Sequence, residues 1–104
     1  MFARNIAFRL KPNMLSTFTQ TLEDQLLPLL KKQNGFQDLL VVENENVYVT
    51  SVSLWDTKEH ADAFDKGAYQ QVLKFLEPVL DGAPKVRTTT VVHSTAHQPV
   101  AVTA

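Results

Sequence analysis

The chain has 104 residues, a formal net charge of −1, three glycines and no cysteine. One compact domain fits this length. The missing cysteines exclude disulfides, zinc–thiolate sites and iron–sulfur clusters, and three scattered glycines cannot build a phosphate-binding loop. A near-neutral charge argues against binding of nucleic acid through a basic face, so we expect no nucleic-acid partner.

The first eleven residues alternate between apolar and polar side chains and lack the apolar run of a signal peptide. No stretch approaches the roughly 20 apolar residues that are needed to span a bilayer. We therefore expect a cytoplasmic protein that has no membrane partner.

The first predicted element is a strand over 2–11, because apolar side chains recur at every second position on one face. That face carries Phe2, Ile6, Phe8 and Leu10, together with Arg4. A helix of about 20 residues follows, with Asn13 as its predicted N-cap. Its apolar stripe consists of Leu15, Phe18, Leu22, Leu26 and Leu29. Pro28 should kink the last turn, because it removes the backbone hydrogen bond to Asp24.

A hairpin is predicted next. Its first strand contains the apolar run 39–42, residues 43–46 form a polar turn, and 47–55 is a second strand rich in β-branched residues. Asp56 and Glu59 then have the spacing of a capping box, which predicts the start of a short helix with Asp56 as its N-cap.

A further helix follows a break at Gly67, with its apolar stripe at Tyr69, Val72, Leu73 and Leu76. The last strand is predicted over 85–93, so that 1–93 forms the domain and 94–104 a flexible tail. The order β-α-β-β-α-α-β is the ferredoxin-like pattern. It predicts an α+β fold in which a four-stranded antiparallel sheet carries its helices on one face.

Both faces of the predicted sheet carry apolar side chains, although helices cover only one of them. The two hairpin strands, 39–42 and 47–55, each place apolar residues on both faces. A second copy packed on the uncovered face would bury these side chains, which predicts a homodimer. The alternative is a monomer with a moderately apolar exposed face.

Two phrases of the sequence carry a family resemblance. Residues 29–36 place Gly35 and Phe36 directly after the first helix, and residues 52–59 end a strand at Trp55 before a polar helix cap. With the element order, these features over 2–93 resemble the antibiotic biosynthesis monooxygenase (ABM) family of the dimeric α/β-barrel superfamily. The phrases are markers of the fold more than of the activity. The resemblance implies two ferredoxin-like subunits forming a dimeric α/β barrel, each with an apolar pocket between sheet and helices.

Some members of that family oxidise phenols or quinols with O₂ and without metal or flavin. The resemblance therefore implies a cofactor-independent monooxygenase that acts on a small aromatic molecule, with no cofactor and no metal. The alternative is a non-catalytic, small-molecule-binding or stress-related protein of the same superfamily. Haem degradation is disfavoured, because the positions that match its Asn, Trp and His are Ile6, Phe64 and Lys74.

Three residues are candidates for catalysis. His60 could accept a proton because the pKa of histidine lies near neutrality, Trp55 could stack on an aromatic substrate, and Tyr69 could donate a hydrogen bond to a substrate oxygen. The predicted substrate-binding wall consists of Ile6, Phe8, Phe18, Phe64 and Phe75. Each residue also has a structural interpretation: a solvated helix residue for His60, an anchor for Trp55, and core packing for the others.

Overall fold

A computed structural model describes residues 1–45 and 47–96. Its elements are β1 (Phe2–Arg9), α1 (Leu15–Thr21), η1 (Leu22–Leu26), α2 (Leu27–Lys31), β2 (Phe36–Asn44), β3 (Tyr48–Trp55), α3 (Lys58–Lys66), α4 (Tyr69–Leu76) and β4 (Lys85–Thr90). This order confirms the predicted pattern of strands and helices. The predicted tail lies outside the described residues from position 97 onward.

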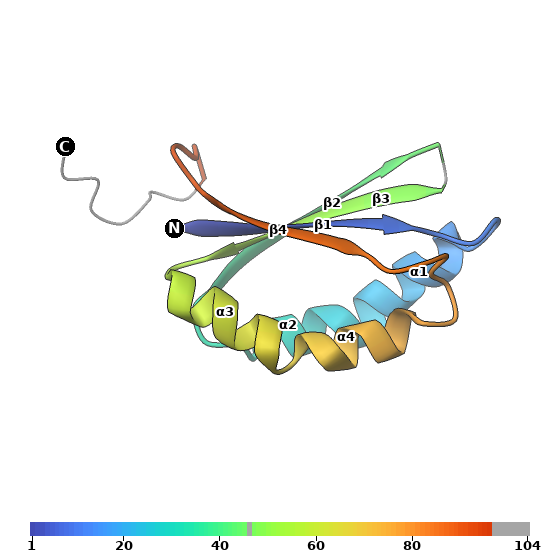
Figure 1. Cartoon of the computed structure of the whole chain (residues 1–104), viewed down its shortest axis with the longest axis horizontal. Coiled ribbons are helices and arrows are strands. Elements are labelled where there is room, and N and C mark those ends of the chain that lie inside the picture. Colours follow the sequence, from blue (N-terminus) through green and yellow to red (C-terminus); the bar gives the residue numbers. More distant parts are fainter. Residues whose placement is uncertain (46, 97–104) are drawn as a thin grey trace.

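The four strands form one antiparallel sheet in the order β2-β3-β1-β4. All helices lie against one face of this sheet, as Figure 1 shows. Alternation along β1 produces this arrangement, because Arg4, Ile6 and Phe8 point toward the helices while Ala7 and Arg9 point away. The predicted ferredoxin-like fold is confirmed.

The first helix runs without a break from α1 through η1 to α2, and its middle is a π-helical turn. Pro28 has no N–H, and its ring conflicts with the carbonyl group four residues earlier. The helix widens before it, so that the Leu27 N–H donates to the Leu22 carbonyl. A π turn therefore takes the place of the predicted kink.

The predicted N-cap at Asn13 is wrong. Asn13 has a left-handed backbone with φ of 63°, a conformation that asparagine tolerates better than most residues. It ends the turn after β1, and the helix begins at Leu15 without a side-chain cap.

The predicted capping box is also wrong, by one residue. Thr57 is the N-cap of α3, and its hydroxyl oxygen accepts a hydrogen bond from the His60 backbone N–H at 3.1 Å. Asp56 lies before the cap, where its carboxylate accepts from the Thr57 N–H at 2.6 Å. Threonine and aspartate are both good caps, so the sequence alone could not choose between them.

The last strand ends at Thr90 and not at His93 as predicted. Thr90 is paired with Phe2, the first residue of β1. Beyond this pair only Met1 remains as a partner, and its carbonyl accepts from the Val91 N–H at 3.0 Å. The strand therefore stops where its neighbour begins.

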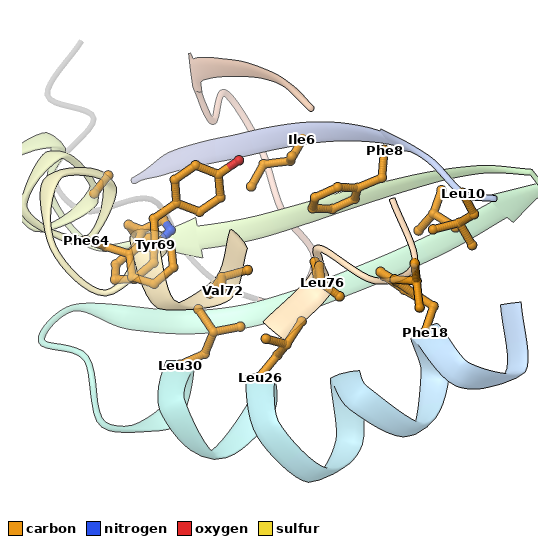
Figure 2. Packing of buried hydrophobic residues seen from close by; sticks show 14 residues of the cluster. Ile6, Phe8, Leu10, Phe18, Leu26, Leu30, Phe64, Tyr69, Val72 and Leu76 are labelled. Carbon is orange, nitrogen blue, oxygen red and sulfur yellow. The ribbon is translucent and has the colours of Figure 1, made fainter. Parts of the chain in front are cut away.

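The hydrophobic core fills the space between the sheet and the helices (Figure 2). Figure 2 shows Leu26 and Leu30 pointing from the first helix toward the sheet, and Ile6 and Phe8 pointing from β1 toward the helices. Three polar side chains are buried in the same layer: Arg4, Ser51 and Ser53.

The opposite face of the sheet, called here the uncovered face, has no helix on it among the described residues (Figure 1). Over the middle of β2 it is apolar, and Leu40 and Val42 are 62% and 51% exposed. Over β4 it carries the exposed cations Lys85 and Arg87. The apolar area is thus confined to one half of this face. The helices themselves offer no segment that is long and apolar enough to cross a membrane, as far as the structure describes them.

Candidate functional site

The two phrases that carry the family resemblance meet in space. The Asp56 N–H donates to the Gly35 carbonyl at 2.9 Å, and the rings of Phe36 and Trp55 contact edge to face at 5.6 Å. Gly35 has φ of +82°, and a Cβ atom there would overlap the side chains of Asp56 and His60. These five residues form a strand–helix junction, and its geometry explains why glycine occupies this position.

His60 belongs to this junction. Its Nδ1 lies 2.7 Å from Asp56 Oδ1, and its side chain is 40% exposed. The hydrogen bond to His60 lowers the pKa of Asp56, while the partial burial of the carboxyl opposes this shift. Trp55 is fully buried, and its indole N–H donates to Ser53 Oγ at 2.9 Å. These two of the three predicted catalytic side chains therefore each have one partner within the protein.

A cavity lies between the sheet and the helices, at the position that the fold predicts for a pocket. Its volume is about 30 Å³, which is enough for about two water molecules. The lining residues come from both layers: Arg4, Ile6, Phe8, Phe18, Leu22, Leu26, Leu30, Leu39, Val41, Ser51, Ser53, Phe64, Tyr69 and Val72. The wall is apolar except at a polar end, where Arg4 is paired with Ser53 across the sheet and lies over the Tyr69 ring, and at Ser51, which is paired with Ile6.

Arg4 is the charged group of this polar end, and its side chain is only 1% exposed. Its guanidinium lies over two aromatic rings, 4.6 Å from the centre of Tyr69 and 5.1 Å from that of Phe64. Nη2 forms an ion pair with the carboxylate of Asp65, whose side chain is half exposed. Nε and Nη1 are buried and have no hydrogen-bond partner among residues 1–45 and 47–96.

Tyr69 lies beside Arg4 and is 5% exposed. Its hydroxyl group is also buried without a partner, and Figure 2 shows the hydroxyl oxygen directed toward Ile6. Burial raises the pKa of the Tyr69 phenol, the adjacent guanidinium of Arg4 offsets part of this rise, and the negative charge of Asp65 adds to it. The hydroxyl therefore stays protonated at neutral pH and can donate a hydrogen bond.

A groove of about 210 Å³ adjoins the cavity at the edge of the sheet. It runs between the first helix and β2, and it shares Phe18, Leu22 and Val41 with the cavity wall. Leu22 also begins the π-helical turn, and such turns frequently occur at functional sites.

The structure brings together five of the eight predicted site residues. The cavity wall contains Ile6, Phe8, Phe18, Phe64 and Tyr69. It does not contain His60, Trp55 or Phe75. Phe75 is 39% exposed and faces away from the core, because it lies on the outer side of α4 between the inward-facing Val72 and Leu76.

The prediction missed Arg4, Ser51 and Ser53 as polar groups of the cavity. The sequence does contain a sign that Arg4 is buried, because Arg4 shares the face of the first strand with Phe2, Ile6 and Phe8. A lone charge on an apolar strand face must be buried with a partner or a ligand. The two serines gave no such signal, since serine is ordinary in strands of any environment.

No family model matches the chain, and no curated protein matches it. Solved structures do match the chain. A protein of unknown function from Nitrosomonas europaea has a TM-score of 0.77 at 14% identity, and the match covers 90% of this chain and 91% of that one.

SnoaB from Streptomyces nogalater, a cofactor-independent oxygenase solved as its N63A mutant, has a TM-score of 0.73 at 9% identity. That match covers 92% of this chain and 97% of SnoaB. A protein from Bordetella bronchiseptica named "Putative antibiotic biosynthesis monooxygenase" has a TM-score of 0.72 at 18% identity, over 88% of this chain and 98% of that one.

These matches agree with the family resemblance of the sequence, and at such low identity they show the shared fold alone. Within the described part of the chain, no three His, Asp or Glu side chains are placed to hold a metal ion. The cavity wall itself contains no histidine and no carboxylate. Its chemistry therefore consists of apolar surface, hydroxyl groups and one guanidinium.

Proposed function

We propose that this protein is a cofactor-independent monooxygenase that binds a small phenol- or quinol-type aromatic molecule in a site formed by the cavity between sheet and helices and the groove that shares its wall. The observation that carries the proposal is the apolar cavity with one polar end, in a fold that is shared with a cofactor-independent oxygenase. In this role the wall residues Ile6, Phe8, Phe18 and Phe64 contact the aromatic body, and Tyr69 donates to a substrate oxygen.

In the proposed reaction the substrate supplies all four electrons that reduce O₂. A phenol reacts with one O₂ to give a quinone and one water, so one oxygen atom becomes a new carbonyl oxygen and the other leaves as water. The ring carbon that is oxidised loses its hydrogen, and the phenolic hydrogen is also lost. Both hydrogens appear in the water, so the reaction needs no external reductant, and the protein has to supply binding, orientation, exclusion of solvent and an acceptor for the phenolic proton.

A second candidate is a non-catalytic small-molecule-binding protein. One observation favours it: the cavity wall contains no histidine or carboxylate that could accept a proton from a phenol. The two functions differ in turnover and share the binding site.

Oxygen consumption tests the proposal. Purified protein is mixed with a panel of quinols and anthrones, and uptake is followed with an oxygen electrode. We expect at least one compound to raise uptake above the buffer rate, and Leu26→Phe to lower it by filling the cavity. Gln71→Ala, at an exposed position of α4, is the matched control and keeps full uptake. Binding of these compounds without any uptake would favour the second candidate.

We propose further that two copies associate through the apolar half of the uncovered face. Leu40 and Val42 supply exposed apolar area there, and the antiparallel pairing places Val52 beside Leu40. Size-exclusion chromatography with light scattering should give twice the mass of the chain, and Leu40→Lys should give the monomer. A wild-type monomer at micromolar concentration would contradict the dimer. The cytoplasmic location stays a prediction.

A further inference from the structure

We propose that Arg4 and Tyr69 form a binding subsite for a negatively charged oxygen group, a carboxylate or a phenolate, carried by an apolar ligand in the cavity. This inference deepens the proposed function, because it names the chemical class of molecule that the same cavity takes. The observation behind it is a cluster of buried hydrogen-bond donors that have no acceptor among the described residues.

Arg4 is held in place by contacts that leave these donors unused. The Tyr69 and Phe64 rings support the guanidinium from their faces at 4.6 and 5.1 Å, and Asp65 pairs with Nη2. Nε and Nη1 then retain three N–H groups. A cation that is fixed and desolvated in this way is prepared for an oxygen ligand, since little side-chain freedom remains to be lost on binding.

Every unpartnered group at this end can donate, and the Tyr69 hydroxyl is the one that can also accept. Arg4 can only donate, and the protonated Tyr69 hydroxyl is available as a further donor. An acceptor-rich group satisfies all of them, and charge-assisted hydrogen bonds are roughly twice as strong as neutral ones.

Asp65 does not remove the attraction for an anion. Its side chain is half exposed, so water screens its charge more than that of the buried guanidinium. A negatively charged oxygen inside the cavity would therefore interact with Arg4 in a poorly solvated region, where Coulomb interactions are strong. This is why we assign the subsite to an anion and not to a neutral alcohol or amide.

The rest of the ligand must be apolar. The cavity itself holds only about 30 Å³, so a ligand body larger than water has to extend toward the adjoining groove of about 210 Å³. The residues that line both spaces are Phe18, Leu22 and Val41. A ligand that displaces these shared side chains would occupy both spaces as one elongated apolar site, with Arg4 in the wall of the cavity.

The test uses benzoate, phenol and benzamide, which share a ring and differ in the charge and acidity of the polar group. Binding is measured by calorimetry at neutral pH and at high pH, where phenol ionises, and the Arg4 Nε–H signal is followed by ¹H–¹⁵N NMR. We expect benzoate to bind at least about tenfold more tightly than benzamide and to shift the Arg4 Nε–H signal. A gain in phenol affinity at high pH would identify phenolate as the source of the anionic oxygen, and no gain would identify carboxylate.

Substitutions separate the subsite from a general effect on the core. Tyr69→Phe removes only the hydroxyl and should weaken benzoate binding by about ten- to hundredfold while leaving benzamide binding nearly unchanged. Arg4→Met should abolish the preference for benzoate. Arg87→Met is the matched control, because this arginine is exposed on β4, and it should bind benzoate as the wild type does.

Equal affinity for benzoate and benzamide, or unchanged benzoate affinity in Tyr69→Phe, would overturn the inference. So would an unmoved Arg4 Nε–H signal at saturating benzoate, which would mean that only water fills the polar end. Benzoate is not a quinol and cannot be turned over as one. Its binding therefore tests the subsite independently of oxygenase activity, and failure of the oxygen-uptake assay leaves this result standing.

Discussion

The molecule has two polar clusters that both contact the Phe64 ring, and they differ in whether their buried hydrogen-bond donors have partners. At the strand–helix junction, His60 is bound to Asp56, and the Trp55 indole N–H is bound to Ser53. At the inner end of the cavity, Arg4 and Tyr69 retain donors without partners. The ring of Phe64 contacts both clusters, at 5.0 Å from Trp55 and 6.1 Å from Tyr69.

This difference separates a structural role from a binding role. A buried group that already has a partner stabilises the fold, as the Trp55 indole does through Ser53, whereas the half-exposed His60 keeps its second ring nitrogen, Nε2, outside the bond to Asp56. Buried donors without acceptors cost folding free energy, and they become favourable only when an acceptor arrives. Residue type alone points to the junction, with its histidine and tryptophan, whereas geometry points to the arginine and tyrosine.

The largest predicted effect is at the centre of the junction. Trp55→Ala removes a side chain that is fully buried between Phe36 and Phe64. We expect it to lower the free energy of unfolding by about 3–5 kcal/mol, as other large core deletions do. Urea denaturation measures this loss. A change below about 1 kcal/mol would mean that Trp55 is not the anchor of the junction.

Gly35→Ala tests the close approach in the same region. Its φ is +82°, and its Cβ would overlap Asp56 and His60, so we expect a loss of about 2–3 kcal/mol in unfolding free energy. Gly82→Ala is the matched control, because φ is +91° there and nothing lies within 4 Å. It should show only the backbone cost of about 1 kcal/mol. Equal losses in the two variants would show that the overlap does not matter.

At the cavity, the expected change in unfolding free energy has the opposite sign. Tyr69→Phe deletes a buried hydroxyl that has no partner, so the unfolding free energy should stay the same or rise by up to about 1 kcal/mol. Urea denaturation without any ligand measures it. A loss of more than about 1 kcal/mol would mean that the hydroxyl is already satisfied and that the two clusters do not differ in the way described.

The smallest effect concerns pH at the junction. The hydrogen bond to His60 lowers the pKa of Asp56 below its ordinary value of 3.8, so the folded state favours the carboxylate. The resulting stability is complete above the ordinary pKa and is lost as the pH falls through the lowered one. The melting temperature of His60→Ala should therefore lie slightly below that of the wild type at neutral pH, and the difference should shrink below about pH 3. A difference that is the same at both pH values would contradict this coupling.

The sequence predicted the fold well because fold-determining signals are local and periodic. The alternation in 2–11, the spacing of the leucines in the first helix, and the phrases around Gly35 and Trp55 each required one arrangement. The predicted helix ends were less accurate, since Asp56 and Thr57 are both good caps and only the fold selects one of them.

The site was predicted in part, for a physical reason. Its apolar wall is also the core, so apolar periodicity found Ile6, Phe8, Phe18 and Phe64. His60 and Trp55 were chosen for their chemistry, but their partners come from folding and were not visible in the pattern. Whether the Arg4 donors have acceptors depends on residues more than forty positions away along the chain, which a single sequence does not reveal.

A crystal structure of the protein with benzoate tests the central claim most directly. We predict the carboxylate oxygens within hydrogen-bonding distance of the Tyr69 hydroxyl and of Arg4 Nε or Nη1, with the ring directed toward Leu22. A structure with water alone at Arg4 and Tyr69, or with benzoate bound only outside the cavity, would contradict the account.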